Sequence, residues 1–290
     1  MLKDKHFKVS VIMNVYNGEK YITHAIQSVL DQSYSNWELV IWDNNSVDKT
    51  YFLIKQFKDR RIKYFKSNIF DSLYSARNKA IQKSTGMLIT FLDVDDLWLP
   101  NKLDYQVKVM QNPDIEFCYS NYYQIGEGGL NSFSKKAYKF LPSGNIYKKL
   151  VSNYKVGILT LCLRKETLLK KNIYFDPRFS IIGDMLLVLN LSKIGIAYAD
   201  QKCLACYRSH RNNLSKRKVL LQVREMRLWF KEKKLSGDWN ENDFKNLISL
   251  TNYHRAKGIY RKLSFIQILK ITLRIKNFYL MMRFLVFWSY

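Results

Sequence analysis

Apolar segments of strand length alternate with helical patterns through the first hundred residues. The strand-length segments are 9–15, 37–42, 62–65 and 87–92. Between them, apolar residues recur at helical spacing, as at Ile22, Ile26 and Val29. This alternation predicts an α/β fold, in which a largely parallel sheet is covered by helices through right-handed crossovers. A chain of 290 residues with 47% hydrophobic residues can bury the core of such a fold.

Polar loops follow the first, second and fourth predicted strands. The first loop holds Tyr16, the second begins with Asp43 and Asn44, and the third spans 93–96. Because the carboxyl ends of parallel strands meet at one edge of a sheet, we expect these loops to lie together and to form a nucleotide-binding cleft. The sequence contains neither GxGxxG nor GxxxxGK[ST], which argues against a dinucleotide site and a P-loop.

The loop after the fourth strand carries three carboxylates, Asp93, Asp95 and Asp96. Their mutual repulsion is unfavourable, and a bound divalent cation removes it. Carboxylate oxygens are the ligands that Mg²⁺ and Mn²⁺ prefer. The alternative is an acidic turn in which Asp95 or Asp96 caps the following helix. The loop taken alone leaves both interpretations open.

The rest of the chain continues the α/β pattern and then changes character. Helices are expected at 101–110, 165–171 and 184–193, strands at 115–119, 159–164 and 197–207, a loop or irregular hairpin at 121–140, and loops at 176–179 and 208–214. From residue 215 the pattern is helical and basic, with few turn signals. We therefore expect an α/β domain at 1–214 and a basic helical region at 215–290.

The formal net charge of +24 implies an anionic partner. Residues 200–290 hold 20 Lys and Arg against 6 Asp and Glu, so much of the excess lies there. These basic residues are interleaved with aromatic and aliphatic ones, and no nucleic-acid motif accompanies them. The pattern favours an anionic membrane surface over nucleic acid. The alternative is that these helices pack on the core and their charges are solvated.

Several features bear on the compartment. The N-terminus shows no signal-peptide pattern, and no apolar run reaches the roughly 18–20 residues of a membrane span. The four Cys show no disulfide-framework spacing. We expect a cytoplasmic protein, peripheral on the inner face of the membrane. Cys203 and Cys206 have CxxC spacing, with His210 following, but the lack of a second pair and the apolar context argue against zinc.

Several motifs, in order, resemble those of family 2 glycosyltransferases. They are VSVIMNVYNGEKY (9–21), IQSVLDQSY (26–34), WELVIWD (37–43), SARN (75–78), Gly86, FLDVDD (91–96), IGD (182–184) and YRSH (207–210). The resemblance covers roughly residues 8–214. It implies a GT-A fold in which 1–100 bind the nucleotide sugar and 101–214 form the acceptor side.

The implied activity is sugar transfer, with inversion, from a nucleoside-diphosphate sugar to a hydroxyl of a saccharide or lipid-linked saccharide. Surface polysaccharide biosynthesis is the implied setting. The departing diphosphate develops negative charge that a divalent cation stabilises, and the attacking hydroxyl must lose its proton to a base. By resemblance, Mn²⁺ or Mg²⁺ is bound by Asp95 and Asp96, and Asp184 is the base. The donor-binding residues implied are Asn14, Tyr16, Asp43, Asn44, Arg77, Asp93, Asp95, Arg208 and His210.

Some of these assignments have a structural alternative. Asp184 also suits the N-cap of the helix that follows it. Arg77 alone would be an ordinary solvated helix residue, and His210 in a basic loop would more often be structural.

The chain departs from the family pattern at two positions. Asn44 stands where the family often has a second acid, the one that usually reads the uracil N3–H. An amide both donates and accepts, so pairing with a base remains possible. Gly183 stands where many members have Glu, and this change should leave the base intact. A second hypothesis is a membrane-associated binding or scaffold protein on a decayed transferase domain. The retained carboxylates argue against it.

Overall fold

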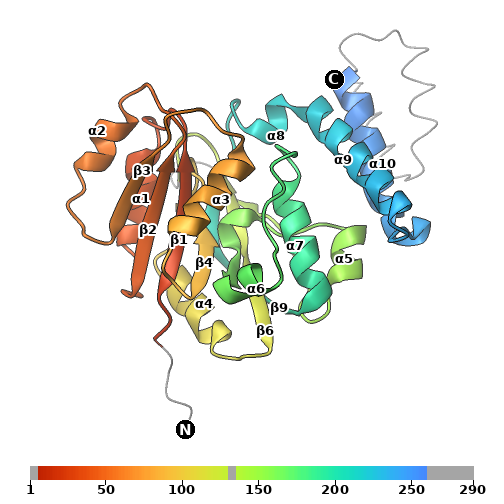
Figure 1. Cartoon of the computed structure of the whole chain (residues 1–290), viewed down its shortest axis with the longest axis horizontal. Coiled ribbons are helices and arrows are strands. Elements are labelled where there is room, and N and C mark those ends of the chain that lie inside the picture. The colour runs from red at the N-terminus through yellow and green to blue at the C-terminus, as the bar shows by residue number, and fades with distance from the viewer. Residues whose placement is uncertain (1–5, 130–134, 260–290) are drawn as a thin grey trace. The chain divides into compact units, whose positions relative to one another are not determined.

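The computed structural model describes residues 6–129 and 135–259, which divide into two compact units (Figure 1). The first, the sheet unit, draws on Met1–Ile146, Lys155–Arg178 and Gly183–His210. The second, the helical unit, draws on Tyr147–Tyr154, Phe179–Ile182 and Arg211–Tyr290. All residues of the candidate site lie in the sheet unit.

The first half of the sheet unit is parallel, as the alternating pattern predicts. Strands β1 (Val9–Val15), β2 (Trp37–Asp43), β3 (Ile62–Lys66) and β4 (Leu88–Phe91) lie in the order β3-β2-β1-β4. Each neighbouring pair is parallel. Helices α1 (Ile22–Leu30), α2 (Thr50–Lys55) and α3 (Leu73–Lys83) connect them. The Ser72 side chain caps α3 by accepting the Ser75 N–H.

The second half of the sheet is mixed. Strand β8 (Cys162–Arg164) pairs antiparallel with β4 and with β6 (Ile115–Ile125). The longest pairing is parallel, between β6 and β9 (Ile196–Arg208). Two short strands, β5 (Leu97–Trp98) and β7 (Lys135–Lys136), pair antiparallel with β9 and β6 respectively. Among the described residues these nine strands form one sheet.

The expected helices of the second half are present with small shifts. They are α4 (Lys102–Met110), α6 (Lys165–Lys170) and α7 (Gly183–Ile194). The predicted strand at 159–164 is wrong in its first part, because a 3-10 turn, η1 (Ile158–Thr160), precedes the three residues of β8. The predicted irregular hairpin is confirmed where it is described, since β7 pairs with β6 and 121–125 continue β6. Arg208 ends β9 instead of opening a loop.

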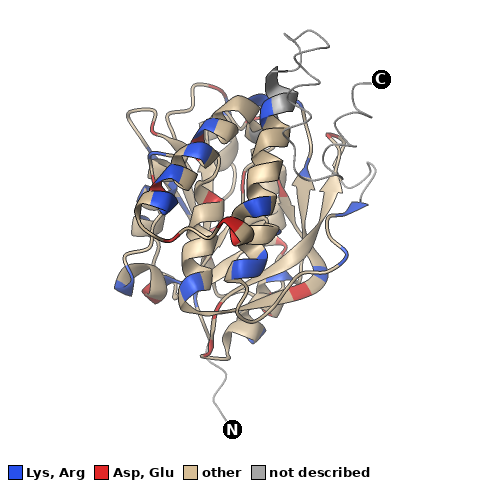
Figure 2. Cartoon of the chain, turned by 90° about the vertical axis from the view of Figure 1, so that its right-hand side faces the viewer, with Lys and Arg blue, Asp and Glu red and all other residues tan. Residues whose placement is uncertain are grey.

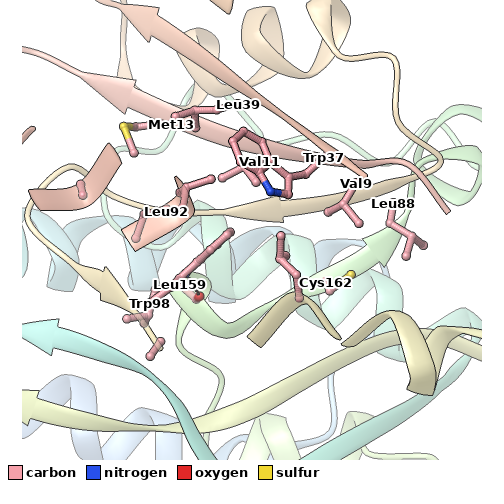
Figure 3. Close-up of a cluster of buried hydrophobic side chains, with 14 of the residues drawn as sticks. Val9, Val11, Met13, Trp37, Leu39, Leu88, Leu92, Trp98, Leu159 and Cys162 are labelled. Atoms are coloured by element: carbon pink, nitrogen blue, oxygen red, sulfur yellow. Dashed lines mark hydrogen bonds between the residues drawn. The ribbon is translucent and has the colours of Figure 1, made fainter. Parts of the chain in front are cut away.

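The core of the sheet unit lies beneath the parallel strands (Figure 3). Val9, Val11 and Met13 of β1 are fully buried, and Met13 lies beside Leu39 of β2. Leu159 and Cys162 belong to the same cluster. Burial of each large aliphatic side chain contributes about 2 kcal/mol, so the mostly apolar β1 anchors the sheet. This burial on both faces explains why β1 and β2 lack the alternation of a half-exposed strand.

The helical unit contains α5 (Tyr147–Ser152), α8 (Leu214–Arg217), α9 (Val219–Leu235) and α10 (Glu241–Ile259). Aromatic rings join α9, α10 and the turn between them, and Trp239 stacks on Phe244 with ring centroids 4.6 Å apart. Within this unit the Glu225 carboxylate accepts the N–H groups of Ser180, Ile181 and Ile182 at 2.7–3.2 Å. Figure 2 shows Lys and Arg spaced along the long helices.

The expectation of helices after residue 215 is met as far as the chain is described, to Ile259. The predicted pattern of 260–290 lies outside the described residues. No helix within residues 6–129 and 135–259 combines the length and apolar character needed to cross a bilayer.

Candidate active site

Three loops meet at one edge of the sheet unit, as predicted from the strand ends. The Asn44 N–H donates to the Val15 carbonyl at 2.8 Å, and the Asn17 N–H donates to Ser46 Oγ at 2.9 Å. The loop after β4 reaches the same edge, since a Cβ added at Gly18 would lie 2.9 Å from the Val94 side chain. Only a glycine allows this close approach between the two loops.

The carboxylates of the third loop each have a different partner. Asp93 pairs with the buried guanidinium of Arg77. His210 Nε2 lies 2.8 Å from Asp95 Oδ2, and Asp96 Oδ1 accepts the Arg208 N–H at 2.9 Å. The last two partners come from the end of β9. The site is therefore assembled from α3, the loop after β4 and the end of β9.

The electrostatics of this loop suit a divalent cation. Burial is the largest cause of a raised pKa at both Asp95 and Asp96, and the neighbouring carboxylates raise both further. His210 opposes the shift at Asp95. A divalent cation would relieve the repulsion. Among residues 6–129 and 135–259, no three His, Cys, Asp or Glu side chains form a complete metal cluster. Mg²⁺ typically binds through one or two carboxylates plus substrate phosphates, which two adjacent Asp residues fit.

The end of β9 closes over the acidic loop. Arg208 Nε donates to the Asp95 carbonyl at 2.8 Å, and its other end donates to the Glu127 carbonyl at 2.9 Å. Tyr21 contacts both side chains of this segment: its ring centroid lies 4.9 Å from the Arg208 guanidinium and 5.5 Å from the His210 ring centroid. The contacts with Tyr21 and Asp95 hold His210 in a fixed position, whereas a lone histidine in a basic loop would have no such partners.

Arg77 is 3% exposed, so it is not a solvated helix residue. Its guanidinium lies 5.6 Å from the ring centroids of both Tyr74 and Phe175. Burial tends to lower the pKa of Arg77, but the neighbouring negative charge of Asp93 leaves it raised. A permanently charged group at this edge can bind an anion such as a diphosphate.

Asp184 lies in the first turn of α7, which begins at Gly183, so it is inside the helix rather than before it. Its Oδ1 accepts the Met185 N–H at 2.8 Å and faces the Tyr74 hydroxyl at 3.4 Å. Burial is the main cause of the raised pKa of Asp184, and the charge of Asp93 adds to it. Arg77, the Met185 N–H and Tyr74 act in the opposite direction. A carboxylate with a raised pKa is a better general base than an ordinary one.

The other side of the edge is built from β1, β2 and the loop after β3. Asp43 is buried and accepts the Ser46 N–H at 2.7 Å and the Tyr64 hydroxyl at 2.6 Å. Tyr16 is half exposed and meets the exposed ring of Phe70 edge-on at 4.6 Å. The two rings form an accessible aromatic surface at the loop tips.

The two asparagines of this region differ in their partners. Asn44 donates to the Asp71 carbonyl at 2.8 Å and accepts the Asp71 N–H at 3.0 Å, so its amide holds the loop after β3. Asn14 is 8% exposed, and neither polar atom of its amide has a hydrogen-bond partner among the described residues. A buried polar group without a partner is unfavourable, so the Asn14 amide is suited to a bound molecule.

Sequence reasoning did not identify Tyr21, Asp71, Tyr74 or Glu127 as members of this site. Tyr21 lies within a motif that was recognised, but its aromatic character alone does not indicate a partner. Glu127 contributes a backbone carbonyl, which any residue type supplies. Cys203 and Cys206 both lie on β9, and among the described residues they belong to no group of three His, Cys, Asp or Glu side chains that could hold a metal ion.

The chain is similar in sequence to known glycosyltransferases. The model of the family described as Glycosyl transferase family 2 matches residues 10–173. The UDP-Glc:alpha-D-GlcNAc-diphosphoundecaprenol beta-1,3-glucosyltransferase WfgD of Escherichia coli is 33% identical over 258 residues, which cover 85% of this chain and 92% of that protein. The putative teichuronic acid biosynthesis glycosyltransferase TuaG of Bacillus subtilis is 33% identical over 217 residues, 72% of this chain and 82% of that protein.

Solved structures share the fold. S. aureus TarS 1-349 in complex with UDP-GlcNAc superposes with a TM-score of 0.66 at 19% identity, over 93% of this chain and 76% of that chain. The mannosyltransferase PcManGT from Pyrobaculum calidifontis, in complex with GDP-Man and Mn²⁺, gives 0.61 at 13% identity, over 89% of this chain and 76% of that chain.

Proposed function

The chain belongs to glycosyl transferase family 2 and is an inverting glycosyltransferase of the GT-A fold. On this basis we propose that it transfers a sugar from a UDP-sugar donor to a sugar carried on a lipid diphosphate. The observation that carries this proposal is the convergence of Asp93, Asp95, Asp96 and Asp184 with Arg77 at one sheet edge. The similarity to an enzyme named for UDP-Glc and a diphosphoundecaprenol acceptor supports the substrate classes. The relatives do not favour the non-catalytic alternative.

The chemistry divides between two parts of the site. An acceptor hydroxyl attacks the anomeric carbon, the bond to the diphosphate breaks, and the hydroxyl proton goes to Asp184. The raised pKa of Asp184 suits it to hold that proton. On the leaving-group side, Arg77, Arg208 and His210 supply positive charge or N–H donors toward the diphosphate. Asp93 holds Arg77 in place through their ion pair.

Asp95 and Asp96 would hold Mn²⁺ or Mg²⁺. When bound, the cation neutralises the charge that develops on the departing diphosphate. The fit rests on the adjacent carboxylates and their raised pKa values. The backbone N–H of Arg208 orients Asp96, and His210 orients Asp95.

The nucleoside base would lie against Tyr16, with Asp43, Asn44 and Asn14 around it. Tyr16 offers an accessible aromatic face, and Asn14 offers an amide that has no hydrogen-bond partner in the described part of the chain. Asp43 is held by Tyr64. Asn44 would contribute to base binding indirectly, because its amide holds the loop after β3 at the edge of the sheet.

Further assignments concern the rest of the chain. We assign residues 1–100 to the donor and 101–214 to the acceptor side. The basic region 215–290 would place the enzyme on the inner, cytoplasmic face of the membrane, where a lipid-linked acceptor for a surface polysaccharide is available. The net charge of +24 and the interleaved aromatic residues support this assignment.

The test is calorimetric titration of UDP into the full chain, with and without Mn²⁺. We expect Mn²⁺ to tighten UDP binding at least about tenfold, because metal and diphosphate share a site. Asp96→Asn should abolish the gain from Mn²⁺ and the turnover of UDP-glucose with a GlcNAc-diphospholipid acceptor. Asp104→Asn, a partly exposed acid paired with Lys108 on α4, is the matched control and should change neither. Unchanged metal dependence in Asp96→Asn would sink the metal assignment.

A further inference from the structure

Gly183 has no room for a side chain. A Cβ built on Gly183 would lie 2.4 Å from Cε2 and 2.6 Å from Cδ2 of the Tyr74 ring. These separations are far below van der Waals contact, and the backbone of Gly183 does not adopt a positive φ. Space, and not backbone conformation, therefore requires glycine here. The aromatic ring of Tyr74 occupies the space that a side chain at position 183 would enter.

Tyr74 is locked in place. It is 1% exposed, and its ring stacks on Phe175 with centroids 5.2 Å apart and planes 7° from parallel. The Arg77 guanidinium lies on the same ring. Asn78, one turn further along α3, exchanges two hydrogen bonds with the Phe175 backbone at 2.7 and 3.1 Å. A ring held on several sides can fix the direction of its hydroxyl.

The hydroxyl of Tyr74 points to the carboxylate that follows Gly183. It lies 3.4 Å from Asp184 Oδ1, a long contact of the kind that shortens when a substrate binds. The Met185 N–H also donates to Oδ1. Both donors that the described residues direct at the Asp184 side chain thus approach Oδ1, which leaves Oδ2 for the acceptor hydroxyl.

We propose that Tyr74 is a positioning residue for the general base, with its ring replacing a side chain at position 183 and its hydroxyl orienting Asp184. This rests on the proposed function of Asp184. Burial and the charge of Asp184 raise the pKa of Tyr74 well above its usual value, so the phenol remains a donor throughout the working range. The charged groups that face Asp184 are Arg77, from the same helix as Tyr74, and Asp93, from the loop after β4.

The first experiment measures the base itself, without substrate. The side-chain carboxyl of Asp184 is titrated by ¹³C NMR in protein labelled at the Asp carboxyl carbon, with the resonance assigned by its loss in Asp184→Asn. Tyr74→Phe keeps the ring and removes the hydroxyl. We expect its Asp184 midpoint to rise by about half a pH unit or more, because the ionised form loses a donor.

A packing role for Tyr74 predicts no shift in Tyr74→Phe, and an unchanged midpoint would overturn the proposal. Tyr119→Phe is the matched control. It also removes a buried hydroxyl, one that donates to the Pro142 carbonyl at 2.5 Å, but it does not contact Asp184. Loss of turnover in Asp184→Asn tests the proposed base separately. If Asp184→Asn keeps its turnover, Asp184 is not the base, but the titration of Asp184 still shows whether the Tyr74 hydroxyl contacts its carboxylate.

The second experiment tests the exclusion of a side chain at position 183. In the wild-type background, Gly183→Ala should lower the Tm by about 5 °C or more, because the new Cβ collides with the Tyr74 ring. In a Tyr74→Ala background, the same change should leave the Tm unchanged or raise it, since Ala favours a helix over Gly. An equal fall in both backgrounds would show that the Tyr74 ring is not what excludes the side chain. The Tyr74→Phe titration stays decisive if Tyr74→Ala does not fold.

Discussion

Lys102 places an ionisable amine inside the sheet unit. Its side chain is fully buried, and Nζ donates to Thr90 Oγ1 at 2.8 Å and to Gln106 Oε1 at 2.6 Å. The amine also lies 3.7 Å from the centroid of the Trp98 ring. Burial lowers the pKa of Lys102 to about 7. Two neutral acceptors and a ring therefore do not compensate fully for the loss of water around the charge.

We predict that Lys102→Met alters the pH dependence of stability. The folded chain has a Lys102 pKa of about 7, below the ordinary 10.5 of the unfolded chain. Between these values the unfolded chain binds one more proton. The wild-type free energy of unfolding therefore gains up to about 1.4 kcal/mol per pH unit from this group as pH rises. Urea unfolding at pH 7, 8 and 9 should show wild type gaining stability relative to Lys102→Met.

The control for this measurement is Lys108→Met, on the exposed side of the same helix. Its difference from wild type should not vary over this pH range. A difference between wild type and Lys102→Met that is equally flat would contradict a low pKa for the buried amine.

At the scale of elements, the parallel half of the sheet was predictable because burial on both faces leaves β1, β2 and β4 mostly apolar. The short β5 and the end of β6 were not, because Tyr122, Tyr123 and Gln124 have no strand-like alternation. They become strand by pairing with β9, about 80 residues later. Propensity over a local window does not contain this pairing.

The candidate site divides in the same way. Asp93, Asp95 and Asp96 are visible in the sequence because three carboxylates follow one strand at short spacing. Arg77 and Asp184 were indicated by motifs that resemble those of the family. Tyr74 and Asp71 were not, because their roles depend on contacts with Gly183, Asp184 and Asn44 that only the folded chain makes. The sequence shows that Gly183 departs from the family pattern, but the physical reason, the adjacent Tyr74 ring, appears only in the structure.

We predict that Glu225→Gln destabilises the helical unit. The Glu225 carboxylate of α9 accepts three consecutive N–H groups, and these belong to the residues just before Gly183. The neutral amide loses the charge assistance and directs an NH₂ group toward N–H donors. We expect urea unfolding to show a loss of about 1–3 kcal/mol.

The control for Glu225→Gln is Glu241→Gln, an exposed acid at the start of α10 that makes none of these contacts. It should change the stability by no more than about 0.5 kcal/mol. Equal effects of the two substitutions would mean that the three N–H contacts contribute nothing specific.

At the scale of the whole molecule, we predict that the net charge of +24 directs the protein to anionic lipid. The full chain should sediment with vesicles containing phosphatidylglycerol but not with pure phosphatidylcholine, and 0.5 M salt should release it. Replacing the exposed Arg224, Arg227 and Lys231 of α9 by Gln should weaken this binding by about tenfold or more, at about 1 kcal/mol per basic residue near the surface.

A matched triple variant distinguishes a specific membrane-binding surface on α9 from attraction by net charge alone. Lys49, Lys55 and Lys58 of the sheet unit are also exposed, and their replacement by Gln removes the same charge. If both triple variants lose equal affinity, the membrane is recognised by net charge alone. Tighter binding to duplex DNA than to anionic vesicles would instead favour a nucleic-acid partner.

The closure of the acidic loop by β9 has a consequence for how the enzyme is made. The carboxylate of Asp96 and the N–H that holds it are 112 residues apart, and His210 lies still later in the chain. A nascent chain that has emerged only as far as Pro100 already exposes all three carboxylates without the strand end that orients two of them. Asp95 and Asp96 therefore gain their partners from the end of β9 only after the ribosome has synthesised the chain as far as His210. The proposed leaving-group site is therefore completed only after residues 208–210 have been synthesised, when the parallel strands can already have formed.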